Sequence, residues 1–217
     1  MPKPEILGSA RSSYTRVARM VCEEKGIEHT LTETELRAPE LFAIHPFGKM
    51  PVLRHGDLTL CESKAIATYL DRAFPGPELI PSDPKLAAQV EQWVSLVNTA
   101  MDPLLIRTYL FAYIAPKTAD GKPDRNTIEG LMPQVREHIS LLEQAVAASD
   151  TLVADRFTLA DVNLLPILFY IRRLPETAKA FAAGTALGRY YDSHATRPSF
   201  VHTIPPLGPP RRAAPGA

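Results

Sequence analysis

Residues 45–72 read HPFGKMPVLRHGDLTLCESKAIATYLDR, and three local patterns in this stretch decide the fold of the first part of the chain. The Met50-Pro51 step precedes a short apolar strand. A proline cannot donate a ladder hydrogen bond, so it belongs at the first position of a strand with the adjacent edge left open. We expect the Met50-Pro51 bond to be cis, because the strand must turn its edge toward a ligand and proline makes the cis form accessible. The His55-Gly56-Asp57 sequence then predicts a hairpin turn.

The third pattern is the Glu62-Ser63 pair, which opens an amphipathic helix. Ser63 and the free N–H groups of a helix start can bind a carboxylate, and the helix dipole favours this. Glu62 supplies the opposite charge for an ammonium group. An extended strand edge nearby suits strand-type pairing with a peptide. The stretch therefore predicts a site for a peptide-like ligand with a zwitterionic amino-acid terminus.

Outward from this stretch, residues 1–74 alternate between strand and helix. Strands are expected at 5–7, 29–32, 51–54 and 58–60, and helices at 16–25, 40–44 and 63–74. This βαβ, short α, ββα order is that of a thioredoxin-like domain, in which the right-handed crossover makes the first two strands parallel. Residues 75–84 are rich in proline and break both periodicities, so they predict a linker.

The remainder of the chain is predicted to be helical. Residues 85–114 form one long helix with a kink at Pro103. A second helix at 127–148 carries a buried stripe made of Leu131, Val135, Ile139, Leu142 and Val146. Thr158 and Asp161 form a capping box that opens a third helix, and shorter helices are expected at 175–183 and 186–191.

We therefore expect a thioredoxin-like domain at 1–76, an all-helical domain at 85–204 and a Pro-rich tail at 205–217. The tail lacks core-forming residues and is predicted to be loose.

The composition excludes several classes of function. The 24 basic and 24 acidic residues balance to a formal net charge of zero without a long run of one sign, which argues against nucleic acid and anionic membranes. The first residues lack the pattern of a signal peptide. The two cysteines, Cys22 and Cys61, have neither a CxxC nor a His/Cys cluster around them, which argues against zinc and a disulfide framework. We expect a soluble protein of a reducing compartment, with both cysteines in the core and Cys61 at the end of a central strand.

Three blocks, in this order, resemble the cytosolic glutathione transferases of the serine type, including bacterial ones: the loop Ser9–Val17, the stretch Met50–Ser63 and the capping box Phe157–Asp161. The resemblance covers about 200 residues. It implies nucleophilic attack of the glutathione thiolate on a small hydrophobic electrophile, with glutathione as co-substrate and no metal or nucleotide. It also implies a cytoplasmic homodimer involved in detoxification. The alternatives are a glutathione-dependent peroxidase or isomerase and a non-catalytic binding protein of the same fold.

The loop between the first strand and the first helix carries the thiol chemistry in this family. A hydroxyl or thiol there hydrogen-bonds the glutathione sulfur and favours the thiolate, which lowers the thiol pKa. Because no cysteine lies in the loop, the candidates are Ser12, Ser13 and Tyr14. Ser12, four residues before Arg16, matches the register of serine-type members. The alternative for both serines is that they only cap the helix.

The resemblance also implies which residues bind the two substrates. Those for glutathione are His45, Lys49, Met50, Pro51, Val52, Glu62 and Ser63. Lys49 would face the glycyl carboxylate as a point charge, whereas His45 either binds the ligand or only organises the turn. Those for the electrophile are Met101, Leu105, Thr108, Tyr109 and Tyr113, at helical spacing on the first long helix. The alternative, strongest for Leu105, is packing within the helical bundle.

Overall fold

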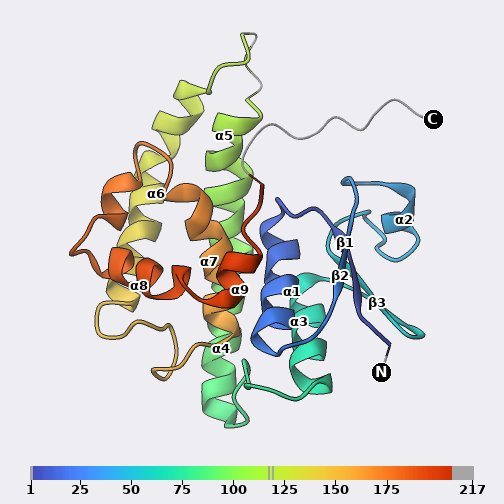
Figure 1. Cartoon of the computed structure of the whole chain (residues 1–217). Coiled ribbons are helices and arrows are strands. Elements are labelled where there is room, and N and C mark those ends of the chain that lie inside the picture. The colour runs from blue at the N-terminus through green and yellow to red at the C-terminus, as the bar shows by residue number, and fades with distance from the viewer. Residues whose placement is uncertain (1, 117, 119, 207–217) are drawn as a thin grey trace.

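The computed structural model describes residues 2–116, 118 and 120–206, so the predicted tail lies almost wholly outside the described residues. Its first half holds four strands and three helices in the predicted order: β1 (Glu5–Gly8), α1 (Ser13–Glu24), β2 (Thr30–Glu33), α2 (Pro39–Phe42), β3 (Val52–His55), β4 (Leu58–Cys61) and α3 (Ser63–Ala73). Figure 1 shows α1 and α3 on one side of the sheet and α2 on the other.

The strands form one sheet in the order β2-β1-β3-β4. β1 and β2 are parallel, as predicted, and the other two pairs are antiparallel. Two expectations were wrong in detail. β3 is an internal strand, paired with β1 on one side and with β4 on the other, so it has no free edge for a ligand. Cys61 ends the edge strand β4 and is half-buried, because β4 and not β3 closes this side of the sheet.

Alternation along the strands divides the core between the two faces of the sheet. Ile6 and Leu53 face α1 and α3 and belong to the main core, whereas Leu7 and Val52 pack with Leu41 of α2. Successive side chains of a strand point to opposite faces, so a period of two produces this division. Both faces of the small sheet are therefore covered.

The second half is helical, as predicted. Its elements are α4 (Pro84–Leu96), η1 (Val97–Leu110), α5 (Phe111–Ile114), α6 (Arg125–Ala145), α7 (Leu159–Ile171), η2 (Ala178–Phe181), α8 (Ala186–Ala195) and α9 (Pro198–His202). The first three follow one another without a break and replace the single kinked helix that was expected. η1 is a π-helical segment that contains Pro103, whose missing N–H interrupts regular α-helical bonding.

Helix α7 is the centre of the molecule. Every residue of α7 except Tyr170 is buried, and the helix packs against α1, α4, η1 and α8. The predicted capping box is present at its start: the Asp161 carboxylate accepts hydrogen bonds from the Thr158 N–H at 2.8 Å and the Thr158 hydroxyl at 3.1 Å. It also accepts from the Leu152 N–H and the Tyr190 hydroxyl, each at 3.0 Å. Asp161 thus joins two helices and a loop.

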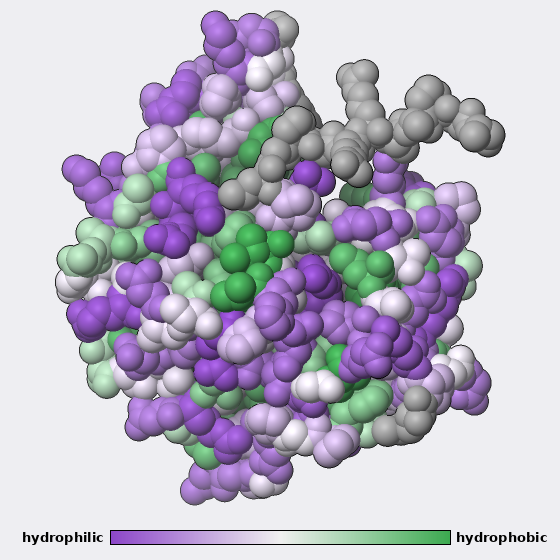
Figure 2. All heavy atoms as spheres, in the orientation of Figure 1, coloured by the Kyte–Doolittle hydropathy of each residue, from purple (hydrophilic) through white to green (hydrophobic). Residues whose placement is uncertain are grey.

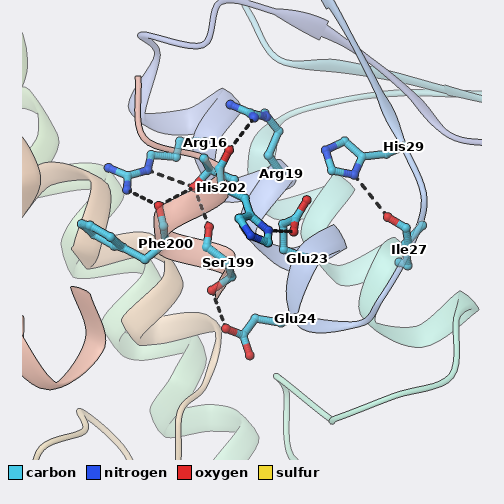
Figure 3. Close-up of polar contacts among 10 residues, drawn as sticks. Arg16, Arg19, Glu23, Glu24, Ile27, His29, Ser199, Phe200 and His202 are labelled. Carbon is cyan, nitrogen blue, oxygen red and sulfur yellow. Dashed lines mark hydrogen bonds and ion pairs between the residues drawn. The ribbon is translucent and has the colours of Figure 1, made fainter. Parts of the chain in front are cut away.

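Helix α9, which the sequence did not predict, docks on α1 (Figure 3). The buried Arg16 of α1 donates to the Phe200 carbonyl at 2.9 Å and to the Thr203 hydroxyl at 3.2 Å, and its guanidinium contacts both the Phe169 and the Phe200 ring. The carboxylate of Glu24 accepts from the Ser199 hydroxyl. These contacts hold α1, whose first turn carries the candidate hydroxyl groups, against the helical half.

No helix of the described residues is long and apolar enough to cross a membrane. Hydrophilic side chains cover most of the face in Figure 2, and hydrophobic ones occur there in small groups.

Candidate active site

A cavity of about 640 Å³ lies between the two halves of the molecule. From the first half it is lined by the loop into α1, by Leu36, and by Lys49 and Met50 ahead of β3. From the second half it is lined by η1 and α5, together with Tyr170 of α7. The Tyr170 hydroxyl donates to the Arg11 carbonyl at 2.6 Å, which fixes the loop against α7. The cavity thus joins the predicted thiol loop to the first long helical run.

All three candidate hydroxyl residues line this cavity, but they have different partners. Ser12 is the N-cap of α1, and its Oγ accepts the Thr15 N–H at 3.3 Å. The Ser13 hydroxyl donates to Oδ1 of Asp102 at 3.2 Å. The Tyr14 hydroxyl lies 3.5 Å from the Asn98 carbonyl oxygen, and burial, together with the nearby Asp102 charge, raises its pKa well above the usual value.

Within the described part of the chain, only Ser12 of these three uses its oxygen as an acceptor while its O–H has no protein acceptor. A thiolate needs a hydrogen-bond donor, so this difference bears directly on the choice among the three. The capping role that the sequence offered as the alternative for Ser12 is also present. It does not compete with donation, because a hydroxyl can accept one bond and donate another.

Asp102 joins the loop to η1. It is 2% exposed, and its Oδ2 accepts from Nε of Arg107 at 2.8 Å while Oδ1 accepts from Ser13. The Arg107 guanidinium lies 5.2 Å from the centre of the Tyr14 ring. A buried carboxylate requires partners of this kind, because an unpaired charge in a low-dielectric site is strongly unfavourable.

The Met50-Pro51 peptide bond is cis, as predicted. The Met50 sulfur accepts the Ser9 N–H at 3.2 Å, so the segment ahead of β3 contacts the loop ahead of α1. Pro51 and Val52 are buried where β3 begins. Lys49 is exposed, lines the cavity and lies over the Phe47 ring.

Glu62 and Ser63 occupy the turn into α3, outside the residues that line the cavity. Glu62 has a φ of +69°, a conformation that non-glycine residues adopt at a cost of roughly 1–3 kcal/mol and that often marks functional sites. Its side chain is 68% exposed, while Ser63 is buried as the first residue of α3. The Glu62 carboxylate is therefore presented to solvent beside a helix N-terminus.

His45 has contacts that favour the role of organising the turn. It is 2% exposed, its Nδ1 accepts the Phe47 N–H at 3.1 Å, and its Nε2 lies 3.2 Å from Oε1 of Glu62. With Nδ1 as an acceptor, Nε2 carries the proton and faces the Glu62 carboxylate. His45 thus lies buried in the turn, beside the exposed Glu62 carboxylate.

The residues predicted for the electrophile lie elsewhere. Met101, Leu105 and Tyr109 are buried in the helical core, and Thr108 lines a separate, smaller hollow beside α6. The hydroxyls of Tyr109 and Tyr113 both donate to Glu176, which also pairs with Arg125. Partial burial opposes ionisation of Glu176, but the hydrogen bonds from Tyr113 and Arg125 outweigh it and lower the pKa to about 2.

The cavity is instead lined by a neighbouring face of the same run: Asn98, Asp102, Ile106, Leu110 and Ile114, with Pro103, Arg107 and Phe111 beside them. The first five recur at intervals of four residues. Asp102 and Arg107, the two charged residues between Val97 and Ile114, were the signal that could have identified this face.

Neither cysteine takes part in the cavity. Cys22 is buried in the core, and burial raises the pKa of its thiol to about 12. Among the described residues, no group of three or more His, Cys, Asp or Glu side chains could hold a metal ion.

Comparison with known proteins agrees with this geometry. The family profile for the glutathione S-transferase N-terminal domain matches residues 7–78, and the profile for the C-terminal domain matches residues 101–198. Glutathione S-transferase 3 of Zea mays is 31% identical over 209 residues, which are 91% of this chain and 92% of that protein. Glutathione S-transferase F10 of Arabidopsis thaliana is 33% identical over 171 residues, 77% of this chain and 78% of that protein.

Solved structures of glutathione transferases are also similar to this chain. A glutathione S-transferase of Methylobacillus flagellatus with glutathione bound is 27% identical, with a TM-score of 0.77 over 94% of this chain and 100% of that one. Glutathione transferase F7 of Populus trichocarpa, at 24% identity, shares the fold with a TM-score of 0.82 over 92% of this chain and 97% of that one. The chain therefore belongs to the glutathione S-transferase family and is a transferase with glutathione as its co-substrate.

Proposed function

We propose that the protein conjugates the glutathione thiolate to small hydrophobic electrophiles, with Ser12 as the residue that stabilises the thiolate. The observation that carries this proposal is the cavity itself. One wall presents the Ser12 hydroxyl at the start of α1, and the opposite wall carries the apolar side chains of Ile106, Leu110 and Phe111. A thiolate held at the first wall would meet an apolar electrophile at the second.

Ser12 is favoured over its neighbours because its O–H is available. Ser13 donates to Asp102, and Tyr14 is directed at the Asn98 carbonyl. A hydrogen bond to the thiolate stabilises the charged form and lowers the thiol pKa, and the N-terminus of α1 acts in the same direction.

We place the peptide part of glutathione along the start of β3, at the Val52 backbone, with Met50 and Pro51 beside it. The γ-glutamyl end would lie at the start of α3: its carboxylate at Ser63 and its ammonium at Glu62. The position of His45 supports this assignment, because its Nε2 lies 3.2 Å from Oε1 of Glu62 on the buried side of the turn. Lys49 would pair with the glycyl carboxylate.

In the reaction, the thiolate sulfur forms a bond to the electrophilic carbon. In a substitution the leaving group departs with its electron pair, and in an addition to an α,β-unsaturated carbonyl compound the displaced electron pair takes up a proton from solvent. Two effects contribute to the rate. The lowered pKa raises the thiolate fraction near neutral pH, and binding both reactants in one cavity replaces a bimolecular encounter.

The test is an assay panel with glutathione and the purified protein: aryl halides, α,β-unsaturated carbonyl compounds, hydroperoxides and an isomerisable double bond. Conjugation of apolar electrophiles, with one glutathione consumed per product, is expected. Glutathione-dependent turnover of hydroperoxides alone would assign a peroxidase, and isomerisation without consumption of glutathione would assign an isomerase. Retention on immobilised glutathione without any turnover would leave only a binding protein.

We also propose the division into domains at 1–76 and 85–204 and a cytoplasmic homodimer. The exposed Phe42 and Phe47, which are 44% and 66% exposed, provide apolar surface that a partner subunit would cover. Sedimentation at micromolar concentration tests the dimer, and a monomer under those conditions would contradict it.

A further inference from the structure

The charges around the cavity are unbalanced. The cationic side chains of Lys49 and Arg107 line it, together with one carboxylate, Asp102. The Asp102 carboxylate is buried and already accepts from Arg107 and Ser13. Low-dielectric walls concentrate the field of such a site, so the cavity attracts anions.

Arg107 is the cation placed for the second substrate. It belongs to η1, the wall opposite the thiol loop, and its side chain remains 45% exposed. Its ion pair with Asp102 uses Nε, and among the described residues its two terminal nitrogens have no acidic partner. A guanidinium held at Nε keeps a planar pair of N–H groups that suits a carboxylate.

The surroundings of Arg107 add an apolar requirement. Its guanidinium lies over the Tyr14 ring, and Ile106 and Leu110 flank it on η1. Farther out, Leu36 and Ile114 line the same cavity and are 62% and 64% exposed. Large apolar side chains this exposed in a concave site indicate a surface that a ligand covers.

We propose that the preferred electrophiles are apolar molecules that carry a carboxylate, and that Arg107 binds this carboxylate. This inference rests on the proposed conjugation reaction and specifies its second substrate. Arg107 determines specificity and takes no part in bond formation.

The test uses two aryl chlorides that undergo the same reaction, 1-chloro-2,4-dinitrobenzene and 4-chloro-3,5-dinitrobenzoate. In both, the thiolate sulfur bonds to the ring carbon and chloride leaves with its electron pair. Values of kcat/KM are divided by the uncatalysed rate constants with glutathione, which removes the difference in intrinsic reactivity. The wild-type protein should prefer the carboxylate by about tenfold, the effect of one charge-assisted contact at a partly exposed site.

Arg107→Gln should abolish this preference, whereas Arg107→Lys should keep part of it because the charge remains. The preference is a ratio between two substrates of one protein, so a general loss of activity from the altered contact with Asp102 cancels. Arg136→Gln, which removes an exposed cation from α6 outside the cavity, is the matched control and should keep the wild-type ratio. The preference should also decrease with added salt, since ions screen a partly exposed pair.

Calorimetry with the two glutathione conjugates gives a readout independent of turnover, and the carboxylated conjugate should bind more tightly only when Arg107 is present. Equal corrected kcat/KM for the two chlorides in the wild-type protein would overturn the inference and leave the proposed function intact. A preference that survives in Arg107→Gln would overturn the assignment to Arg107. Failure to conjugate either chloride or any other electrophile of the panel would overturn the proposed function and this inference with it.

Discussion

Replacing Ser12 with alanine is the most direct test of the proposed chemistry. The substitution removes two interactions at once: the proposed hydrogen bond to the glutathione thiolate and the cap in which Oγ accepts the Thr15 N–H at 3.3 Å. The first acts on the thiol pKa and the second on the stability of α1, so the two losses can be measured separately.

The magnitude follows from one hydrogen bond to a charged group, worth roughly 1.5–3 kcal/mol. Because about 1.4 kcal/mol corresponds to one pKa unit, Ser12→Ala should raise the pKa of bound glutathione by about one to two units. The thiolate is the reactive form, so kcat near neutral pH should fall about tenfold to a hundredfold and recover in alkali. Loss of the cap should lower the free energy of unfolding by about 1 kcal/mol or less, since the bond is long.

The assay is the pH dependence of kcat at saturating glutathione, combined with ultraviolet absorbance of the bound thiolate. Ser13→Ala is the matched control. It removes the bond to Asp102 and so lowers the level of kcat, but it removes no donor to the thiolate, so the pKa of its pH profile should match that of the wild type. Ser12→Asp keeps a capping oxygen but donates no proton and adds a negative charge. It should therefore unfold like the wild-type protein and still lose activity. An unchanged profile for Ser12→Ala beside a shifted one for Ser13→Ala would refute the assignment.

Three other predictions concern binding and stability. Glu62→Ala and Ser63→Ala should each weaken glutathione binding about tenfold to a hundredfold by the loss of a charge-assisted contact; calorimetry that finds wild-type affinity in the double variant would exclude this pair. Asp161→Ala should lower the free energy of unfolding by roughly 3 kcal/mol in urea titrations, because it leaves buried donors without an acceptor; an unchanged midpoint would contradict the role of the capping box. In the folded protein the pKa of Glu176 is lowered to about 2, whereas in the unfolded chain it is about 4.3. The ionised Glu176 therefore stabilises the fold fully above a pH of about 4.3, and this stabilisation is lost as the pH falls toward 2. Glu176→Gln should therefore destabilise the protein at neutral pH and flatten the decline in stability between these pH values, and equal slopes for both proteins would argue against this ion pair.

The sequence predicted the sheet half well because its signals are local. Gly56 has a φ of +62° in the turn between β3 and β4, and Ser63 begins α3, as the turn and capping patterns indicated. The position of β3 inside the sheet could not be read in the same way. It depends on which strand pairs with β1, and this is a contact between residues more than forty positions apart.

The difference between local signals and long-range contacts also explains why the face of η1 that lines the cavity was not identified from the sequence. We expected a regular α-helix there. The spacing of Met101, Leu105 and Tyr109 places them on one face of such a helix, but it does not say whether that face lines a cavity or packs in the core. In the structure these three are buried, and the π-helical turns around Pro103 bring Asp102 and Arg107 to the cavity. A change of helical period is set by tertiary packing and by a proline whose effect on register the local pattern does not specify.

The bond between Ser13 and Asp102 explains how this molecule can combine a fixed thiol site with a variable second site. Ser13 follows the capping residue of α1, so its bond to η1 holds the first turn of α1 at a set distance from the wall that faces the electrophile. Arg107 contacts the same carboxylate from the other side. One buried Asp102 therefore positions both the helix start that carries Ser12 and the guanidinium to which we assign substrate preference. Within the described residues, Leu36 and Ile114 form no hydrogen bond to α1, and we expect their replacement to alter the shape of the cavity without moving the thiol site.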